Sequence, residues 1–277
     1  MQVAEPLVRS WKASLSLEFS FENQKTRLTR KIHDGPLVVQ KPLYPEGEAV
    51  CHAIVVHPPG GIAGGDELTL NAVAGRQASV LLTTPGAAKW YRSAGAQAKQ
   101  SIAFGVQGLL EWLPQETIVF DGALAETAFA ADLDADAGLI GWDIVCLGRT
   151  GSGERFRRGR YRSTFQLRRE GRLLWLERGR IDGGGRLLES PAGLNGQPVF
   201  GTLFACFPNF EGKMLNALRA ENPTDGEGAV TLLPGVLLAR YLGDSSEAAR
   251  RYFTALWRIL RPALAGRDAV EPRIWRT

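Results

Sequence analysis

The sequence predicts an all-β protein. One observation behind this fold class is a period-two alternation of apolar and polar residues, and the other is the even spacing of glycine- and proline-rich breaks between the alternating segments. Short strands at such spacing are typical of a sandwich, a barrel or a solenoid, and the chain shows no fixed sequence period that would prove a solenoid. With 277 residues, 44 % hydrophobic composition and no low-complexity linker, residues 1–277 are expected to form one domain.

The clearest strand comes first, over residues 12–21. Its odd-numbered positions are apolar and its even-numbered ones are mostly serine, which is typical of a half-buried strand. The same reasoning predicts further strands at 26–32, 36–41, 50–57, 67–73, 77–83, 98–104, 108–113, 116–120, 125–133, 139–147, 155–168, 172–182, 199–206, 228–233 and 236–242. Glu170 and Gly171 predict a hairpin turn between two of these strands, and 182–185 predicts a loop.

Two α-helices are predicted near the C-terminus. The first spans about 210–220 and precedes Pro223. The second has Asp244 as its expected N-cap, with Glu247 three residues later, and Pro262 as its expected end. Its apolar stripe consists of Ala249, Phe253, Leu256 and Leu260.

Composition indicates a cytoplasmic protein. No window approaches 18 uninterrupted apolar residues, and the N-terminal segment lacks the basic and apolar regions of a signal peptide, so neither a membrane span nor secretion is expected. Cys51, Cys146 and Cys206 are widely spaced and each lies in or beside apolar sequence. They are therefore expected to be buried, reduced thiols.

Charge is distributed unevenly along the chain. Residues 1–148 hold 11 Lys and Arg against 16 Asp and Glu, whereas residues 149–277 hold 22 against 13. The basic excess peaks in an arginine stripe made of Arg155, Arg157, Arg158, Arg160, Arg162, Arg168, Arg169, Arg172, Arg178 and Arg180. Such a stripe can be a solvated strand face that keeps an exposed edge from pairing, a contact for an acidic protein, or a nucleic-acid-binding surface.

The most unusual segment is HPPGGIAGGD, at 57–66. Its two prolines and four glycines exclude a helix or a central strand, and it separates two apolar runs. We therefore expect a shaped loop held between strands. The segment is not a phosphate-binding loop, because it lacks both the Lys-Ser/Thr ending and the G-x-G-x-x-G spacing, and strand-like sequence follows it.

Other catalytic and metal-binding patterns are missing. The three histidines, His33, His52 and His57, all precede residue 58, and Ser93 has no evident base or G-x-S-x-G context. Cys51 and His57 alone do not make a metal site, since tight sites need three or four converging ligands. No tightly bound cofactor is expected.

Carboxylates inside apolar runs are the more informative signal. Asp143 interrupts LIGWDIVCLG, and Glu177 interrupts LLWLERGRI on the expected strand face of Leu173, Trp175 and Ile181. Such a carboxylate is costly unless it is paired or faces water or an ion. One reading is an internal ion pair with Arg178 or Arg180. The other is a polar interior lining, which Asp66 at the end of the glycine loop could join.

Several long motifs, in order and covering nearly the whole chain, resemble the UreD (UreH) family of urease accessory proteins. They are HPPGGIAGGD (57–66), TTPGAAKWYRSAG (83–95), EWLPQETIVFDGA (111–123), GWDIVCLGRTGSGERFRRGRYR (141–162), LLWLERGRID (173–182), LWRILRP (256–262) and PRIWRT (272–277). The family-signature loop consists of His57, Pro58, Pro59, Gly60, Gly61, Gly64 and Gly65.

The resemblance implies a fold, a role and a set of partners. The implied fold is a β-helix-like stack of many short strands with two helices, forming a single UreD-type domain over 1–277. The implied role is non-enzymatic: a maturation scaffold or chaperone that joins UreF and the GTPase UreG, docks on apo-urease and helps to deliver nickel. No membrane or nucleic-acid partner is expected from it. The alternative function is a β-fold nucleic-acid-binding protein that uses the arginine-rich 155–180 stripe.

The resemblance also implies an internal passage for transient nickel(II). Its lining would correspond here to Asp66, Ser93, Asp143 and Glu177. A passage must admit an ion and also release it, which scattered carboxylates and hydroxyls allow and a Cys/His cage does not. The scarcity of histidine is therefore compatible with nickel transit.

Overall fold

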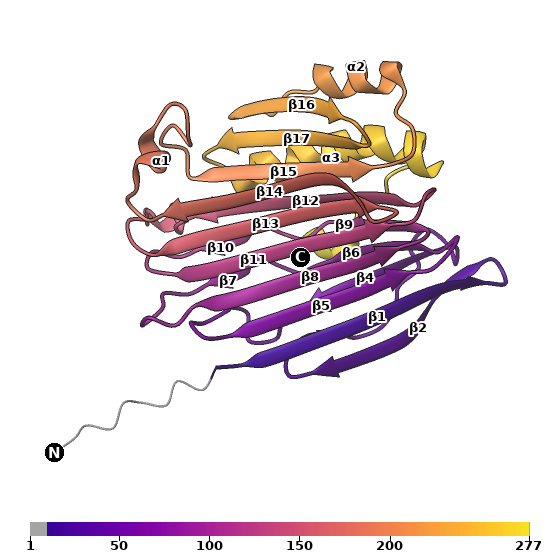
Figure 1. Cartoon of the computed structure of the whole chain (residues 1–277), viewed down its shortest axis with the longest axis horizontal. Helices are drawn as coiled ribbons and strands as arrows, with labels where there is room; N and C mark the ends of the chain where they lie inside the picture. The colour runs from indigo at the N-terminus through magenta and orange to yellow at the C-terminus, as the bar shows by residue number, and fades with distance from the viewer. Residues whose placement is uncertain (1–9, 277) are drawn as a thin grey trace.

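Two β-sheets face each other across the core of the protein (Figure 1). The structure is a computed structural model and describes residues 10–276. In strand order, the seven-stranded sheet contains β14 (Arg172–Asp182), β13 (Arg160–Arg169), β11 (Leu124–Leu133), β8 (Ala98–Val106), β5 (Glu67–Ala74), β1 (Lys12–Glu22) and β2 (Lys25–Asp34). The ten-stranded sheet contains β16 (Glu227–Leu233), β17 (Val236–Gly243), β15 (Val199–Cys206), β12 (Gly138–Leu147), β9 (Leu109–Trp112), β6 (Ser79–Thr83), β4 (Val50–Val56) and β3 (Val38–Val39), with β10 (Thr117–Val119) beside β12 and β7 (Ala88–Trp90) beside β10.

The chain winds between the sheets like a coil. From β4 it passes to β5, β6, β8, β9, β11, β12 and β13, and the strands that successive turns add to each sheet run parallel. This is the β-helix-like stack expected from the family resemblance, so the fold prediction is confirmed. The turns differ in length and carry different breaks, which explains why the sequence has no fixed period.

Both predicted helices are present, with different ends. α2 spans Gly212–Ala220 and α3 spans Ser246–Ala265. The predicted cap was wrong by one residue, because the Ser245 side chain accepts the Ala248 N–H bond. The predicted end was also wrong. Pro262 lies inside the last turns, and α3 ends at Gly266 in the left-handed conformation.

Some predicted strands are shorter than expected. The strand predicted at 155–168 begins only at Arg160, because the N–H groups of Arg157 and Arg158 donate to Asp121 Oδ1 at 2.9 and 2.8 Å instead of joining a sheet. The strand predicted at 36–41 is reduced to β3, and that at 77–83 begins at Ser79. The sequence reasoning missed β7, the single-turn helix α1 (Arg186–Glu189) and the 3₁₀ turns η1 (Thr150–Ser152) and η2 (Arg273–Arg276).

Two apolar cores result from this arrangement. The larger lies between the sheets, and the smaller lies between the ten-stranded sheet and α2 and α3. α3 packs against β12, β15 and β17, on the outer side of the ten-stranded sheet. All three cysteines are buried and free, as predicted. The polar features below lie in the core between the two sheets.

Candidate functional site

The ten-stranded sheet contains a local break. β6 and β7 are separated by residues 84–87, and β9 and β10 by residues 113–116, with a proline in each gap. β12 is continuous and pairs with β9 through residues 138–141 and with β10 through residues 145–147. Asp143 therefore lies on β12 opposite the gap, where β9 has ended and β10 has not begun. The gap in strand pairing therefore lies beside the Asp143 carboxylate.

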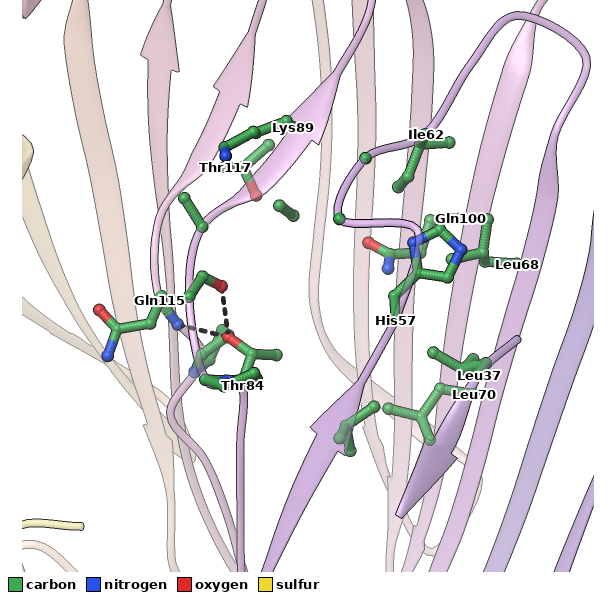
Figure 2. A pocket seen from close by; sticks show the side chains of 18 of the residues that line it. Leu37, His57, Ile62, Leu68, Leu70, Thr84, Lys89, Gln100, Gln115 and Thr117 are labelled. Carbon is green, nitrogen blue, oxygen red and sulfur yellow. Dashed lines mark hydrogen bonds between the residues drawn. The ribbon is translucent and has the colours of Figure 1, made fainter. Parts of the chain in front are cut away.

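A cavity of about 310 Å³ lies at this opening. Figure 2 shows Thr84 and Gln115 on one side of it and His57 and Gln100 on the other. The Thr84 hydroxyl holds the gap loops together, because it accepts the Gln115 N–H bond at 2.9 Å and donates to the Gly86 carbonyl at 3.2 Å. The polar lining residues include His57, Thr84, Lys89, Gln100, Gln115, Thr117 and Asp143.

Asp143 is the carboxylate among the residues that line this cavity. Burial raises the pKa of its carboxyl to about 7, and a hydrogen bond with the Tyr161 hydroxyl opposes part of this rise. Tyr161 comes from the opposite sheet, and its hydroxyl also lies 3.1 Å from Thr127 Oγ1. Burial and the nearby Asp143 raise the Tyr161 pKa well above its usual value. A polar contact thus bridges the two sheets.

Strand register extends this contact into a row. In the ten-stranded sheet Asp143 is opposite Thr202, which is opposite Arg240. In the seven-stranded sheet, one register line joins Gln100, Thr127, Ser163 and Gly179. We call these residues the polar row: Gln100, Thr127, Ser163, Gly179, Asp143, Thr202 and Arg240.

The polar row differs from its neighbours in accessibility. Two positions away on the same strands, Ala98, Ala125 and Phe129 are buried in the core. The polar-row residues keep partial solvent accessibility although they face inward, except for Thr202, which is buried. A polar, partly hydrated layer therefore crosses the core from the cavity toward β14 and β17.

An ion pair closes the far end of the polar row. Arg240 Nη1 donates to Glu177 Oε1 at 2.9 Å and to Thr202 Oγ1 at 2.6 Å, and Arg240 Nη2 donates to Glu177 Oε2. The guanidinium also lies over the Trp175 ring, at 5.7 Å from its centroid. The prediction that Glu177 forms an ion pair is thus confirmed, but its partner is Arg240.

The partners named from sequence were wrong because they lie on the other face of β14. Arg178 and Arg180 alternate with Glu177 and point outward. Leu173 was also placed on the wrong face. A bulge after Leu167 shifts the register so that Leu173 is opposite Arg168, and its side chain is 45 % exposed.

Asp66 has a local role in the glycine loop. It is 3 % exposed, and its two oxygens accept N–H bonds from Trp11 and Ala63, each at 2.8 Å. It therefore fixes the end of the loop to the start of β1. It is not among the residues that line the cavity.

His57 lies at the start of the same loop and does line the cavity. Its Nε2 is buried and has no hydrogen-bond partner among residues 10–276. Burial lowers the pKa of the imidazole, and the nearby Asp66 carboxylate opposes part of this change. The ring is therefore neutral at pH 7.

Ser93 lies on a neighbouring loop. Its hydroxyl donates to the Ala96 carbonyl and accepts the Gly95 N–H bond at 3.0 Å. A Cβ on Gly64 would lie 2.4 Å from Ser93 Oγ, so the two loops are stacked closely. The structure brings Asp143 and Glu177 to the two ends of one polar layer and places Asp66 and Ser93 in adjacent loops outside it.

Sequence reasoning missed Gln100, Tyr161, Thr202 and Arg240. The available signal was the presence of polar residues at the inward positions of alternating strands, such as Thr202 in VFGTLFAC and Arg240 in VLLARYLG. Among residues 10–276, no group of three or more His, Cys, Asp and Glu side chains could hold a metal ion.

Comparison with known proteins identifies the family. The family model described as UreD urease accessory protein matches residues 12–276. The urease accessory protein UreD of Dechloromonas aromatica (strain RCB) is 55 % identical over 274 residues, covering 97 % of this chain and 95 % of that protein. The UreD of Azoarcus sp. (strain BH72) is 52 % identical over 279 residues, covering 100 % and 97 %.

The chain belongs to the UreD family of urease accessory proteins. The recognition from sequence motifs is confirmed. Membership places the chain in urease maturation as an accessory protein and not as an enzyme. Within residues 10–276, no helix is both long and apolar enough to cross a membrane.

Two C-terminal motifs of this UreD-family chain brace the broken sheet. In LWRILRP, Arg261 is fully buried and contacts Glu46 and Glu111, while Trp257 Nε1 donates to Glu111 at 2.7 Å. In PRIWRT, Trp275 Nε1 donates to Thr83 Oγ1 at 2.8 Å, next to the first gap. These contacts attach α3 and η2 to the strands that end at the cavity.

Proposed function

We propose that this chain is a urease maturation scaffold that joins UreF and UreG, docks on apo-urease and helps to deliver nickel to its active site. The observation that carries the proposal is the polar row between the cavity and the Glu177–Arg240 pair. An inward-facing polar layer in the core of a β-stack costs folding free energy unless its polar groups are hydrogen-bonded or contact water or an ion. Family membership supports the maturation role itself.

The donor set supports transit of nickel(II) through the protein. Beside the cations Lys89 and Arg240, which do not bind a metal, the cavity and the polar row offer hydroxyls, two amides and one carboxylate. These groups can replace part of an ion's hydration shell without trapping it. Because the pKa of Asp143 is about 7, this carboxyl can exchange its proton for a passing cation at neutral pH. Cys51 and Cys206 are poor competitors for nickel, since burial raises their pKa to about 11 and about 12 and keeps them protonated.

A cytoplasmic location is part of the proposal. It is supported by three buried, unpaired cysteines, which fit a reducing compartment.

The deciding experiment is expression of the urease operon with and without this chain. We expect that omission of the chain leaves apo-urease assembled but removes both its activity and its bound nickel. Full nickel loading without the chain would overturn the proposal. Metal content measured on purified urease distinguishes failed nickel delivery from failed assembly.

A further inference from the structure

The two sheets do not end together at the β14–β16 end of the stack. β17 faces β14, because Arg240 bonds to Glu177 and lies over Trp175. β16 extends the ten-stranded sheet one strand further, and sheet order places no strand of the seven-stranded sheet opposite it within residues 10–276. Figure 1 shows β17 and β16 continuing beyond β14. The seven-stranded sheet is therefore one strand short at this end.

The inner face of β16 is exposed as a result. Register with β17 puts Ala229, Thr231 and Leu233 on the side that faces the core, and all three are exposed. α2 covers part of the other face of β16, where Val230 is partly buried and Arg219 bonds to its carbonyl at 3.3 Å, while Leu232 on that face stays 36 % exposed. All three inner-face positions are exposed.

The strand beside this face has a free edge. β14 ends the order of its sheet, and within residues 10–276 only β13 pairs with it. An unpaired edge is a template for another strand. Leu173 and Leu176, on the outer face of β14, are 45 % and 43 % exposed. These two exposed leucines offer apolar contact area to a strand added at the edge.

The charges on the outer face select the kind of strand that fits. Arg162 is directly opposite Arg180 on β14 and Glu126 on β11, and the like charges of the first pair destabilise a sheet. Asp182 neutralises Arg180 through a 2.9 Å bond, but no ion pair within residues 10–276 involves Arg162, Arg172 or Arg178. On this face β14 carries Arg178 and Arg180 against Asp182, so a second copy of this chain would bring more positive than negative charge to the edge. An acidic segment would relieve the repulsion.

We infer that the free edge of β14 and the bare inner face of β16 form a slot for one extended segment of a partner protein. The segment adds to β14 as a strand, places small or apolar side chains against Ala229, Thr231 and Leu233, and directs acidic side chains toward Arg178. The inference rests on the proposed function, because it gives a maturation partner its contact surface. The slot lies beside Glu177 and Arg240, at the end of the polar row.

The test compares binding of the full chain and its variants to purified UreF and to purified apo-urease. Leu233→Asp changes the inner face and Arg178→Glu changes the outer face. Ile32→Asp is the matched control, since Ile32 is 51 % exposed on β2 at the opposite end. We expect both slot variants to weaken binding of the same partner by more than about tenfold, and the control to change it by less than about twofold.

Amide hydrogen exchange supplies a second measurement that does not depend on the variants. Strand addition should protect amides of β14 when the wild-type chain binds its partner. Circular dichroism of each variant verifies that its fold is retained.

Retained binding by both folded slot variants, without protection of β14, would overturn the inference and leave the proposed function standing. If the wild-type chain binds neither UreF nor apo-urease, the inference and the proposed function are both overturned. A duplex DNA or RNA probe tests the remaining class of ligand. If Arg178→Glu weakens only binding to that probe, with a steep salt dependence, the surface binds nucleic acid and the inference is wrong.

Discussion

The Asp143 carboxyl on β12 and the Tyr161 hydroxyl on β13 lie close enough across the core that each shifts the pKa of the other. The two residues come from sequence motifs on opposite sheets and meet beside the cavity. The tyrosine gives the buried carboxyl a polar partner, while no cation is paired with it among the ion pairs of residues 10–276. At pH 7 the Asp143 carboxyl is therefore close to its pKa, so its neutral and ionised forms are both populated.

The first prediction concerns the pH dependence of stability. The pKa of Asp143 rises from 3.8 to about 7 on folding, so the folded state holds the proton to higher pH than the unfolded state. The free energy of unfolding should therefore fall as pH rises from about 4 to about 7, by at most about 4 kcal/mol. Asp143→Asn should lack this loss. Urea unfolding of both proteins between pH 4.5 and pH 8 measures it, and a difference that stays constant with pH would contradict the prediction.

The second prediction concerns nickel transfer. Asp143→Ala and Glu177→Ala should leave complex formation intact and reduce nickel incorporation, because each removes a carboxylate from one end of the polar layer. Ser93→Ala is a useful comparison, because Ser93 bonds within its own loop outside that layer. The measurement is nickel bound to urease purified after co-expression. Normal loading with both carboxylate variants would assign the two residues a structural role.

The sequence was sufficient to predict most of the strands, although not the short β7, because alternation is a local property. The sequence also identified Asp143, since a carboxylate in an apolar run can be recognised without a structure. The partner of Glu177 could not be found in this way, because Arg240 is 63 residues away in the chain and the pairing depends on how β17 faces β14. The bulge near Leu167 was equally invisible, and it moved Leu173 to the outer face. Register between distant strands creates the polar row, and no local pattern specifies register.

The third prediction concerns the buried ion pairs that Arg261 on α3 forms with Glu46 and Glu111. Arg261 is 0 % exposed and bonds to Glu46 at 2.7 Å and to Glu111 at 3.1 Å. Arg261→Ala should lower the free energy of unfolding by about 3–5 kcal/mol, because it removes the guanidinium from two buried carboxylates, of which Glu46 keeps only its contact with His52. Arg258→Ala, on the same helix, should cost less than about 1 kcal/mol, since Arg258 forms a surface pair with Glu271. Chemical denaturation of both variants tests this, and equal losses would refute it.

The fourth prediction concerns the stacking of the signature loops. A Cβ on Gly61 would lie 2.2 Å from Cε2 of the Tyr91 ring. Gly61→Ala should therefore destabilise the protein by about 1–1.5 kcal/mol, because the Tyr91 ring, although 38 % exposed, must leave its rotamer and its contact with Phe120, whose centroid is 5.2 Å away. In a Tyr91→Ala background the same substitution should cost clearly less, because the clash is gone. Thermal unfolding of the two single variants and the double variant gives the coupling directly.

Gly86→Ala provides the matched control for this cycle. Gly86 also lies in a loop at the cavity, but a Cβ there would meet no atom within 4 Å, and its φ is not in the left-handed region. It should change stability by less than about 1 kcal/mol. If Gly61→Ala behaves like Gly86→Ala, the close approach of the two loops is not what requires glycine at this position. If only Gly61→Ala destabilises the protein and Tyr91→Ala removes this loss, glycine is required at position 61 because the loop that carries Tyr91 packs against it.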